Sequence, residues 1–188
     1  SKEHKSSAST GAQAVTGVVL AGGLGRRMGG FDKGLLELRG HLMIEWVVKR
    51  FAPQVTQVFI NANRSNEQYA MLGYPIIADA TTDFRGPLAG VAAALASVET
   101  PWVATVPCDS PLVAPDLVER LKSQVLARGA RVAVAHDGSR LQPVFMLLHS
   151  DLLTDLEIYL ESGERKIDCW LERHSFEIVD CSDNPEMF

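Results

Sequence analysis

Short apolar runs, often rich in β-branched residues, recur along the chain, and segments with helical spacing of apolar positions separate them. A continuous apolar run that stops at a glycine, a proline or a polar residue is typical of a strand buried on both faces, as in a parallel sheet. This pattern predicts strands over residues 18–20, 55–60, 74–79, 102–106, 131–135, 143–148 and 176–179.

Apolar positions three and four residues apart predict helices over residues 42–51, 91–98, 115–127, 151–160 and 167–171. Strands that alternate with helices, with most strands apolar throughout, predict an α/β protein: a three-layer α/β/α sandwich around a Rossmann-like, mainly parallel sheet. We expect residues 15–188 to form a single domain. Residues 1–14, rich in Ser, Ala and Lys, are expected to form a disordered tail.

The composition limits the kinds of partner that the chain can bind. Its formal charge is −5 at pH 7, so it lacks the overall positive charge typical of nucleic-acid-binding proteins. No apolar run approaches the ~20 residues that a membrane-spanning helix needs. The three cysteines form neither a C-x-x-C zinc pattern nor a disulfide framework. We therefore expect a cytoplasmic protein that binds neither nucleic acid nor membranes.

The first predicted strand runs into a basic, glycine-rich loop. Residues 20–33 read LAGGLGRRMGGFDK, with five glycines and three cations. Glycine lets a ligand approach backbone N–H groups that a Cβ atom would shield. Cations around such exposed amides suit a polyphosphate, so the loop is a candidate nucleotide-binding site.

This loop differs from the two commoner phosphate-binding loops. A Walker loop has a lysine directly after its last glycine, followed by Ser or Thr, whereas Phe31 and Asp32 follow Gly30. The dinucleotide fingerprint needs a third glycine after Gly23 and Gly25, and an acidic residue about 20 positions on. Both are missing here, so neither motif explains the loop.

Polar side chains stand where three later strands are predicted to end: Asn61, Asp79 and Asp109. The carboxyl ends of parallel strands share one edge of a sheet, where ligands bind. Pro107 and Pro111 restrict the backbone on either side of Asp109. A carboxylate facing a polyphosphate would repel it unless a cation such as Mg²⁺ lay between them. Taken alone, Asn61 also suits a side-chain turn, and Asp109 a capping role.

A second glycine-containing segment precedes the helix predicted at residues 91–98. Residues 84–90 read FRGPLAG. The N-terminus of a helix presents unpaired N–H groups that favour an anion. Small residues also allow a helix to pack closely on a sheet, and the sequence leaves both interpretations open.

The ordered motif at residues 20–33 resembles the opening motif of the nucleotidyltransferases, and most closely that of the molybdenum cofactor guanylyltransferase family. Sugar-phosphate members of the wider superfamily usually have Ala in place of Gly22 and Pro in place of Asp32, so this variant favours the cofactor branch. A stretch similar to residues 86–90 lines the nucleotide pocket in that family. The resemblance implies a fold of the nucleotide-diphospho-sugar transferase type.

The resemblance also implies a reaction: GMP is transferred from GTP to the molybdopterin cofactor, which releases pyrophosphate. It implies that Asp109 holds Mg²⁺, and that Arg26 and Lys33 stabilise the leaving pyrophosphate, so that these three residues are catalytic candidates. The candidate GTP-binding residues are Leu20, Ala21, Gly22, Lys33, Asn61, Asp79 and Asp109. Molybdenum-cofactor insertion proteins and molybdoenzyme chaperones are the implied partners.

Several alternatives stay open at this point. A molybdopterin cytidylyltransferase would use CTP with the same metal, and a sugar-phosphate nucleotidyltransferase would use another acceptor. A non-catalytic nucleotide sensor or adaptor is an alternative of another class, although a pure binder needs no metal at the reacting phosphate. Residues 165–166 are basic, so they could bind a second anionic substrate or simply be solvent-exposed charges at the start of a helix. The family's Asn-x-Asn-Thr-Pro segment, which usually follows a stretch like residues 183–188, is not in this sequence.

Overall fold

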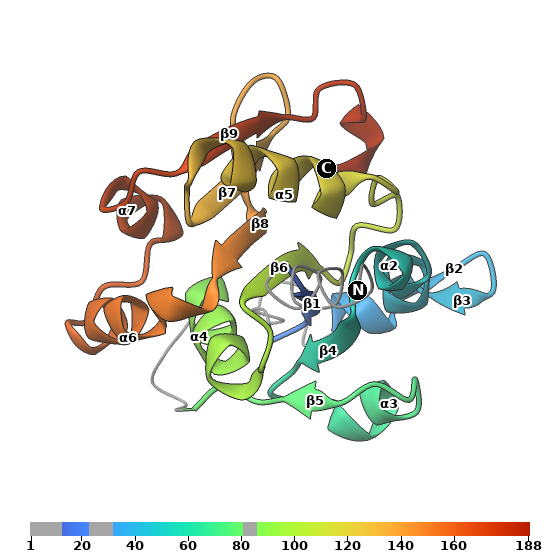
Figure 1. Ribbon diagram of the computed structural model, residues 1–188. Coiled ribbons are helices and arrows are strands. Elements are labelled where there is room, and N and C mark those ends of the chain that lie inside the picture. Colours follow the sequence, from blue (N-terminus) through green and yellow to red (C-terminus); the bar gives the residue numbers. More distant parts are fainter. Residues whose placement is uncertain (1–12, 23–31, 81–85) are drawn as a thin grey trace, which may run out of the picture.

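The computed structural model describes residues 13–22, 32–80 and 86–188. They contain a central sheet with the spatial order β5-β4-β1-β6-β8-β7-β9 (Figure 1). Its strands are β1 (Val15–Leu20), β4 (Gln57–Asn61), β5 (Ile76–Ile77), β6 (Trp102–Pro107), β7 (Val132–His136), β8 (Leu141–His149) and β9 (Glu177–Asp180). Only β8 runs against its neighbours β6 and β7, and the other neighbouring pairs are parallel. The prediction of a mainly parallel sheet is confirmed.

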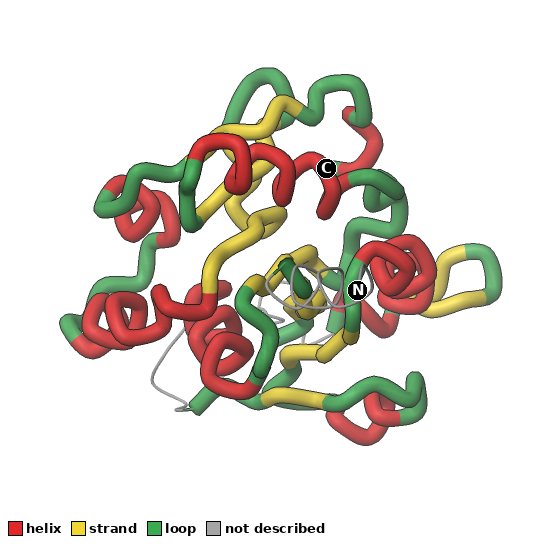
Figure 2. The backbone as a smooth tube through the Cα atoms, in the orientation of Figure 1, coloured by secondary structure: helices red, strands yellow, loops and turns green. Residues whose placement is uncertain are grey.

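Helices cover both faces of this sheet. One face carries α2 (Met43–Phe51) and α5 (Leu117–Arg128), and the other carries α4 (Pro87–Ser97), α6 (Leu153–Glu161) and α7 (Ile167–Glu172), as Figures 1 and 2 show. A shorter helix, α3 (Asn66–Ala70), lies beside β5. The predicted three-layer α/β/α sandwich is therefore confirmed. Short 3₁₀ turns lie at η2 (Lys33–Leu35), η3 (Ala52–Gln54), η4 (Ser150–Leu152) and η5 (Pro185–Met187), and a small hairpin pairs β2 (Glu37–Leu38) with β3 (His41–Leu42).

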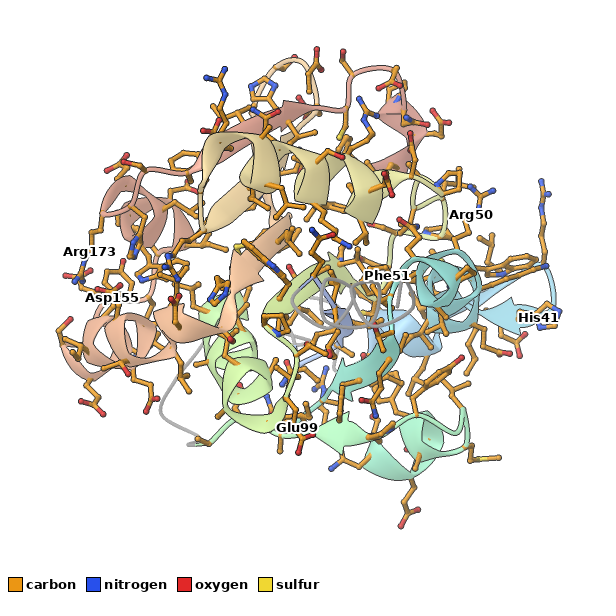
Figure 3. The ribbon with its side chains drawn as sticks, viewed as in Figure 1. His41, Arg50, Phe51, Glu99, Asp155 and Arg173 are labelled. Atoms are coloured by element: carbon orange, nitrogen blue, oxygen red, sulfur yellow. The ribbon has the colours of Figure 1, made fainter. Side chains whose placement is uncertain are left out.

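Strand β1 separates two hydrophobic cores. Val15 and Val19 pack toward α2, whereas Val18 packs toward α4. Phe51, labelled in Figure 3, lies against the backbone of β1, since a Cβ atom on Gly17 would come within 2.7 Å of its ring. The missing side chain at Gly17 lets this aromatic ring seat α2 directly on the central strand.

The helices α6 and α7 are joined by a cluster around the Asp155 carboxylate. It accepts hydrogen bonds from Trp170 Nε1 at 2.9 Å and from His174 Nε2 at 2.8 Å. Arg173 Nη2 lies 3.3 Å from Asp155 Oδ1, and Figure 3 labels both of these residues. Burial opposes ionisation of this carboxyl, but these partners outweigh burial and lower the pKa of Asp155. We assign the cluster a structural role.

Several elements differ from the sequence-based predictions: β1, for example, begins at Val15, three residues before the predicted start at residue 18. Helix α4 begins at Pro87, four residues before the predicted start at residue 91, because Gly86, with φ of 88°, turns the chain and Pro87 suits the first helical turn. Strand β5 is limited to Ile76–Ile77 within the predicted 74–79. Helix α3 was not predicted.

None of the helices in the described part of the chain is long and apolar enough to cross a membrane. Residues 1–12 of the expected tail lie outside the described residues.

Candidate active site

The ends of the central strands are held in register at one edge of the sheet. Leu20, the last residue of β1, lies opposite Asn61 on one side and Pro107 on the other. The ladder continues beyond the strands, because Ala21 N donates to Asn61 O at 2.8 Å and Cys108 N donates to Leu20 O at 3.2 Å. The segments that follow β1, β4 and β6 therefore start from fixed positions.

A cation and a carboxylate meet at this edge. Lys33 opens the 3₁₀ turn η2, Asp109 follows β6, and their Nζ and Oδ2 atoms are 3.7 Å apart. The side chains are 52% and 37% exposed, so a ligand can reach both. An ion pair this exposed adds at most about 1 kcal/mol to stability.

Asp79 is held by two asparagine side chains. Asn61 Nδ2 donates to Asp79 Oδ1 at 2.9 Å and also to the Ile77 carbonyl at 3.1 Å. Asn63 Nδ2 donates to Asp79 Oδ2 at 2.9 Å, and Asp79 N donates back to Asn63 Oδ1 at 2.8 Å. Asn61 is buried, whereas Asp79 is partly exposed. Asp79 can thus accept further hydrogen bonds from a ligand, with Asn61 and Asn63 fixing its orientation.

Two glycines leave room for this network. A Cβ atom on Gly22 would lie 2.9 Å from Asn63 Nδ2, and one on Gly90 would lie 2.3 Å from Asn61 Oδ1. Gly90 is in the first turns of α4. The close approach supports packing of α4 on the sheet as one reason for the small residues at positions 86–90.

We expect Gly90→Ala to lower both stability and activity. Glycine to alanine inside a helix ordinarily stabilises a protein by about 1 kcal/mol, but here the new methyl group would displace Asn61 and, through it, Asp79. The expected result is a lower Tm and a kcat/KM for the nucleotide reduced at least about tenfold. Ala92→Gly, in the same helix, is the matched control and should lower Tm without this loss of activity. A Gly90→Ala protein with a higher Tm and unchanged kinetics would show that the contact is unimportant.

The thiol beside Asp109 is buried, which disfavours its thiolate form. Cys108 is 7% exposed, and burial, followed by the charge of Asp109, raises its pKa to about 12. The thiol therefore stays protonated at neutral pH, where only the thiolate would attack. We therefore assign Cys108 no catalytic role.

The structure brings most of the predicted site residues to this edge. Leu20, Ala21 and Gly22 lie next to the Asn61 and Asp79 network, and Lys33 faces Asp109. Arg26 lies outside the described residues. Sequence reasoning missed Tyr69, whose hydroxyl donates to Asp32 Oδ1, and gave Asn63 and Gly90 no specific partner. The signal for Asn63 was its position two residues after the end of β4.

The described residues form a mainly parallel α/β/α sandwich with a carboxylate after β6, and the sequence that follows β1 is basic and rich in glycine. Residues 17–178 match the MobA-like NTP transferase domain family. The chain belongs to this family, which confirms the predicted membership.

Individual proteins within and around this family are similar to most of the chain. The molybdenum cofactor guanylyltransferase of Shewanella sp. (strain MR-4) is 47% identical over 174 residues, which cover 93% of this chain and 88% of the relative. The protein of the same name from Shewanella sediminis is 45% identical over 93% of this chain and 89% of its own. The crystal structure of molybdopterin-guanine dinucleotide biosynthesis protein A from Archaeoglobus fulgidus matches with a TM-score of 0.73 and 26% identity, over 89% of this chain and 84% of that chain.

Proposed function

We propose that this protein transfers GMP from GTP to molybdopterin, forms the molybdopterin guanine dinucleotide cofactor and releases pyrophosphate. The observation that carries the chemistry is the exposed pair of Lys33 and Asp109 at the carboxyl edge of the sheet. The proposed substrates are based on the relatives. Proteins that are 45–47% identical over 93% of this chain carry the name molybdenum cofactor guanylyltransferase. The protein is thus a nucleotidyltransferase enzyme.

The reaction needs no protein nucleophile or base. The phosphate of molybdopterin is already ionised at neutral pH, and one of its oxygens attacks the α-phosphorus of GTP. A new P–O bond forms as the bond between the α-phosphorus and the bridging oxygen breaks, and pyrophosphate leaves with that electron pair. In this proposal Lys33 stabilises the charge that develops on the leaving group, so catalysis consists of orientation and charge stabilisation.

The nucleotide is proposed to lie between the end of β1 and the network around Asp79. Backbone groups of Leu20, Ala21 and Gly22 are available close to that network. Asp79 is the direct polar contact in this proposal, and Asn61 acts by holding Asp79. Arg26 is a further proposed contact with the phosphates.

Nucleotidyltransferases of this kind use a divalent metal ion, and we propose that here it is Mg²⁺ held by Asp109. Among the residues that the structure describes, no group of three or more His, Cys, Asp or Glu side chains could hold a metal by itself. A single exposed carboxylate still fits Mg²⁺, which keeps several waters and is bound by one or two carboxylates together with substrate phosphates. The ion would offset the negative charge of the triphosphate.

Removal of divalent cations should therefore stop turnover without unfolding the protein. With EDTA in excess, we expect pyrophosphate release to fall to background while Tm stays unchanged, since the metal binds with the nucleotide. Addition of Mg²⁺ in excess of the chelator should restore the rate. Full activity in EDTA, or a large drop in Tm, would contradict a metal that enters with the substrate.

The proposed substrates can be tested by nucleotide choice. The protein is incubated with each of the four ribonucleoside triphosphates and Mg²⁺, with and without molybdopterin, and pyrophosphate is measured. Release only from GTP and only with molybdopterin supports the proposal. Release only from CTP would identify a cytidylyltransferase, and tight binding without turnover would identify a sensor.

The place of the reaction in the cell and the recipients of its product are part of the same proposal. All three cysteines are free thiols, which suits the reducing cytoplasm that we expect. Handover to cofactor insertion proteins and molybdoenzyme chaperones stays a prediction.

A further inference from the structure

Tyr69 makes a buried polar contact with the segment that carries Lys33. It lies on α3, its side chain is fully buried, and its hydroxyl donates to Asp32 Oδ1 at 2.5 Å. Burial, reinforced by this bond, raises the pKa of Tyr69, so the hydroxyl remains a donor. A phenylalanine would fill the same space, so packing alone does not explain the hydroxyl.

The Asp32 side chain makes no other hydrogen bond to a described residue. Asp32 precedes the 3₁₀ turn η2 without capping it, although its backbone carbonyl accepts from Leu35 N at 3.0 Å. Asp32 Oδ2 is buried and has no hydrogen-bond partner within the described residues. The Tyr69 hydroxyl is thus the one described group that fixes this carboxylate, in the residue directly before Lys33.

The same hydroxyl also touches the turn itself. A Cβ atom on Gly34 would lie 2.7 Å from the Tyr69 oxygen and 3.1 Å from Cys108 Cβ. Gly34 follows Lys33, and Cys108 precedes Asp109. The turn therefore packs against Tyr69 and the end of β6, and Lys33 and Asp109 are the sequence neighbours of the residues that make this contact.

We propose that Tyr69 is a positioning residue, which holds the Lys33 ammonium at the reacting phosphates through its contacts with Asp32 and Gly34. This inference rests on the proposed function, because it assigns Lys33 a role in the transfer step. Tyr69 itself does not touch substrate. If it acts only through Lys33, its hydroxyl should matter little once the ammonium group is gone.

The test is a double-mutant cycle of Tyr69→Phe and Lys33→Ala, with kcat and KM for GTP measured in molybdopterin-dependent turnover. We expect Tyr69→Phe to lower kcat about tenfold with KM changed less than about threefold, because the leaving-group charge develops in the transition state. In the Lys33→Ala background, the same change should cost less than about twofold. An equal cost in both backgrounds, or an unchanged kcat in Tyr69→Phe with only a lower Tm, would overturn the inference.

Further variants separate positioning from general loss of structure. Tyr74→Phe is the matched control, since the Tyr74 hydroxyl makes no hydrogen bond to any described residue, and it should retain wild-type kcat. Asp32→Asn keeps an oxygen that can accept a hydrogen bond from the Tyr69 hydroxyl and should retain most of the activity, whereas Asp32→Ala should match Tyr69→Phe. Should Asp32→Asn be as impaired as Asp32→Ala, the hydrogen bond would not be the cause. A wild-type protein without GTP-dependent turnover would instead defeat the proposed function.

Discussion

Replacing Asp109 by alanine is expected to lower kcat about a hundredfold to a thousandfold while the protein stays folded. The carboxylate is the proposed protein ligand of Mg²⁺, and loss of one preorganised electrostatic group at a reacting phosphate typically costs about 3 kcal/mol or more of transition-state stabilisation. Its only ion pair among the described residues is the exposed contact with Lys33, which contributes little to stability. Steady-state kinetics with GTP and molybdopterin, together with Tm, test this expectation.

Asp116→Ala is the matched control for this substitution. Asp116 is an exposed aspartate on the same loop, and its side chain makes no capping hydrogen bond to α5. The net charge changes equally in both variants, so a long-range charge effect would appear in both. Undiminished activity of Asp109→Ala would remove this residue from the site, and equal losses in the two variants would point to overall charge.

Lys33→Ala is expected to lower kcat about tenfold to a hundredfold. The ammonium group faces the Asp109 carboxylate at 3.7 Å and is half exposed, which suits a group that binds phosphate oxygens. The charge on the leaving pyrophosphate is greater in the transition state than in bound GTP, so kcat should fall by more than KM rises. The measurement is the dependence of initial rate on GTP concentration at saturating molybdopterin.

Lys49→Ala provides the comparison for Lys33. Lys49 is an exposed lysine on α2 whose Nζ lies 5.7 Å from the centre of the Trp46 ring. Its removal takes away the same charge without touching the carboxyl edge, and the rate should stay within about twofold of wild type. A Lys33→Ala variant with normal kcat would show that the leaving group is stabilised by other residues.

The fold was predictable because most of its strands appear in the sequence as continuous apolar runs. The strand predicted at residues 102–106 and the helix predicted at residues 115–127 lie within two residues of β6 and α5 at either end. The strand is an apolar run that ends at a proline, and the helix has apolar residues at helical spacing and ends at Gly129. The start of α4 was missed by four residues. Glycine is usually unfavourable inside a helix, but Gly90 is needed there for the close approach to Asn61, so a tertiary contact overrode the local preference.

The sequence indicated the part of the candidate site that consists of polar side chains at strand ends. The positions of Asn61, Asp79 and Asp109, at or just after the ends of β4, β5 and β6, were predictable because parallel strands bring their carboxyl ends to one edge. Tyr69 was missed, since a tyrosine in a five-residue helix has no periodic signal and its partner, Asp32, is 37 positions away. That Asn61 is buried and holds Asp79 likewise required coordinates. The roles in GTP binding, metal binding and catalysis assigned to all of the predicted site residues stay predictions.

The most direct test of guanylyl transfer is to follow two isotopic labels of GTP through one reaction with molybdopterin. GTP labelled at the α-phosphorus should deliver its label to the dinucleotide product, and GTP labelled at the γ-phosphorus should deliver its label to pyrophosphate. Label from the γ-position in inorganic phosphate or in the acceptor would instead show hydrolysis or phosphoryl transfer. That result would contradict an attack at the α-phosphorus beside Lys33 and Asp109.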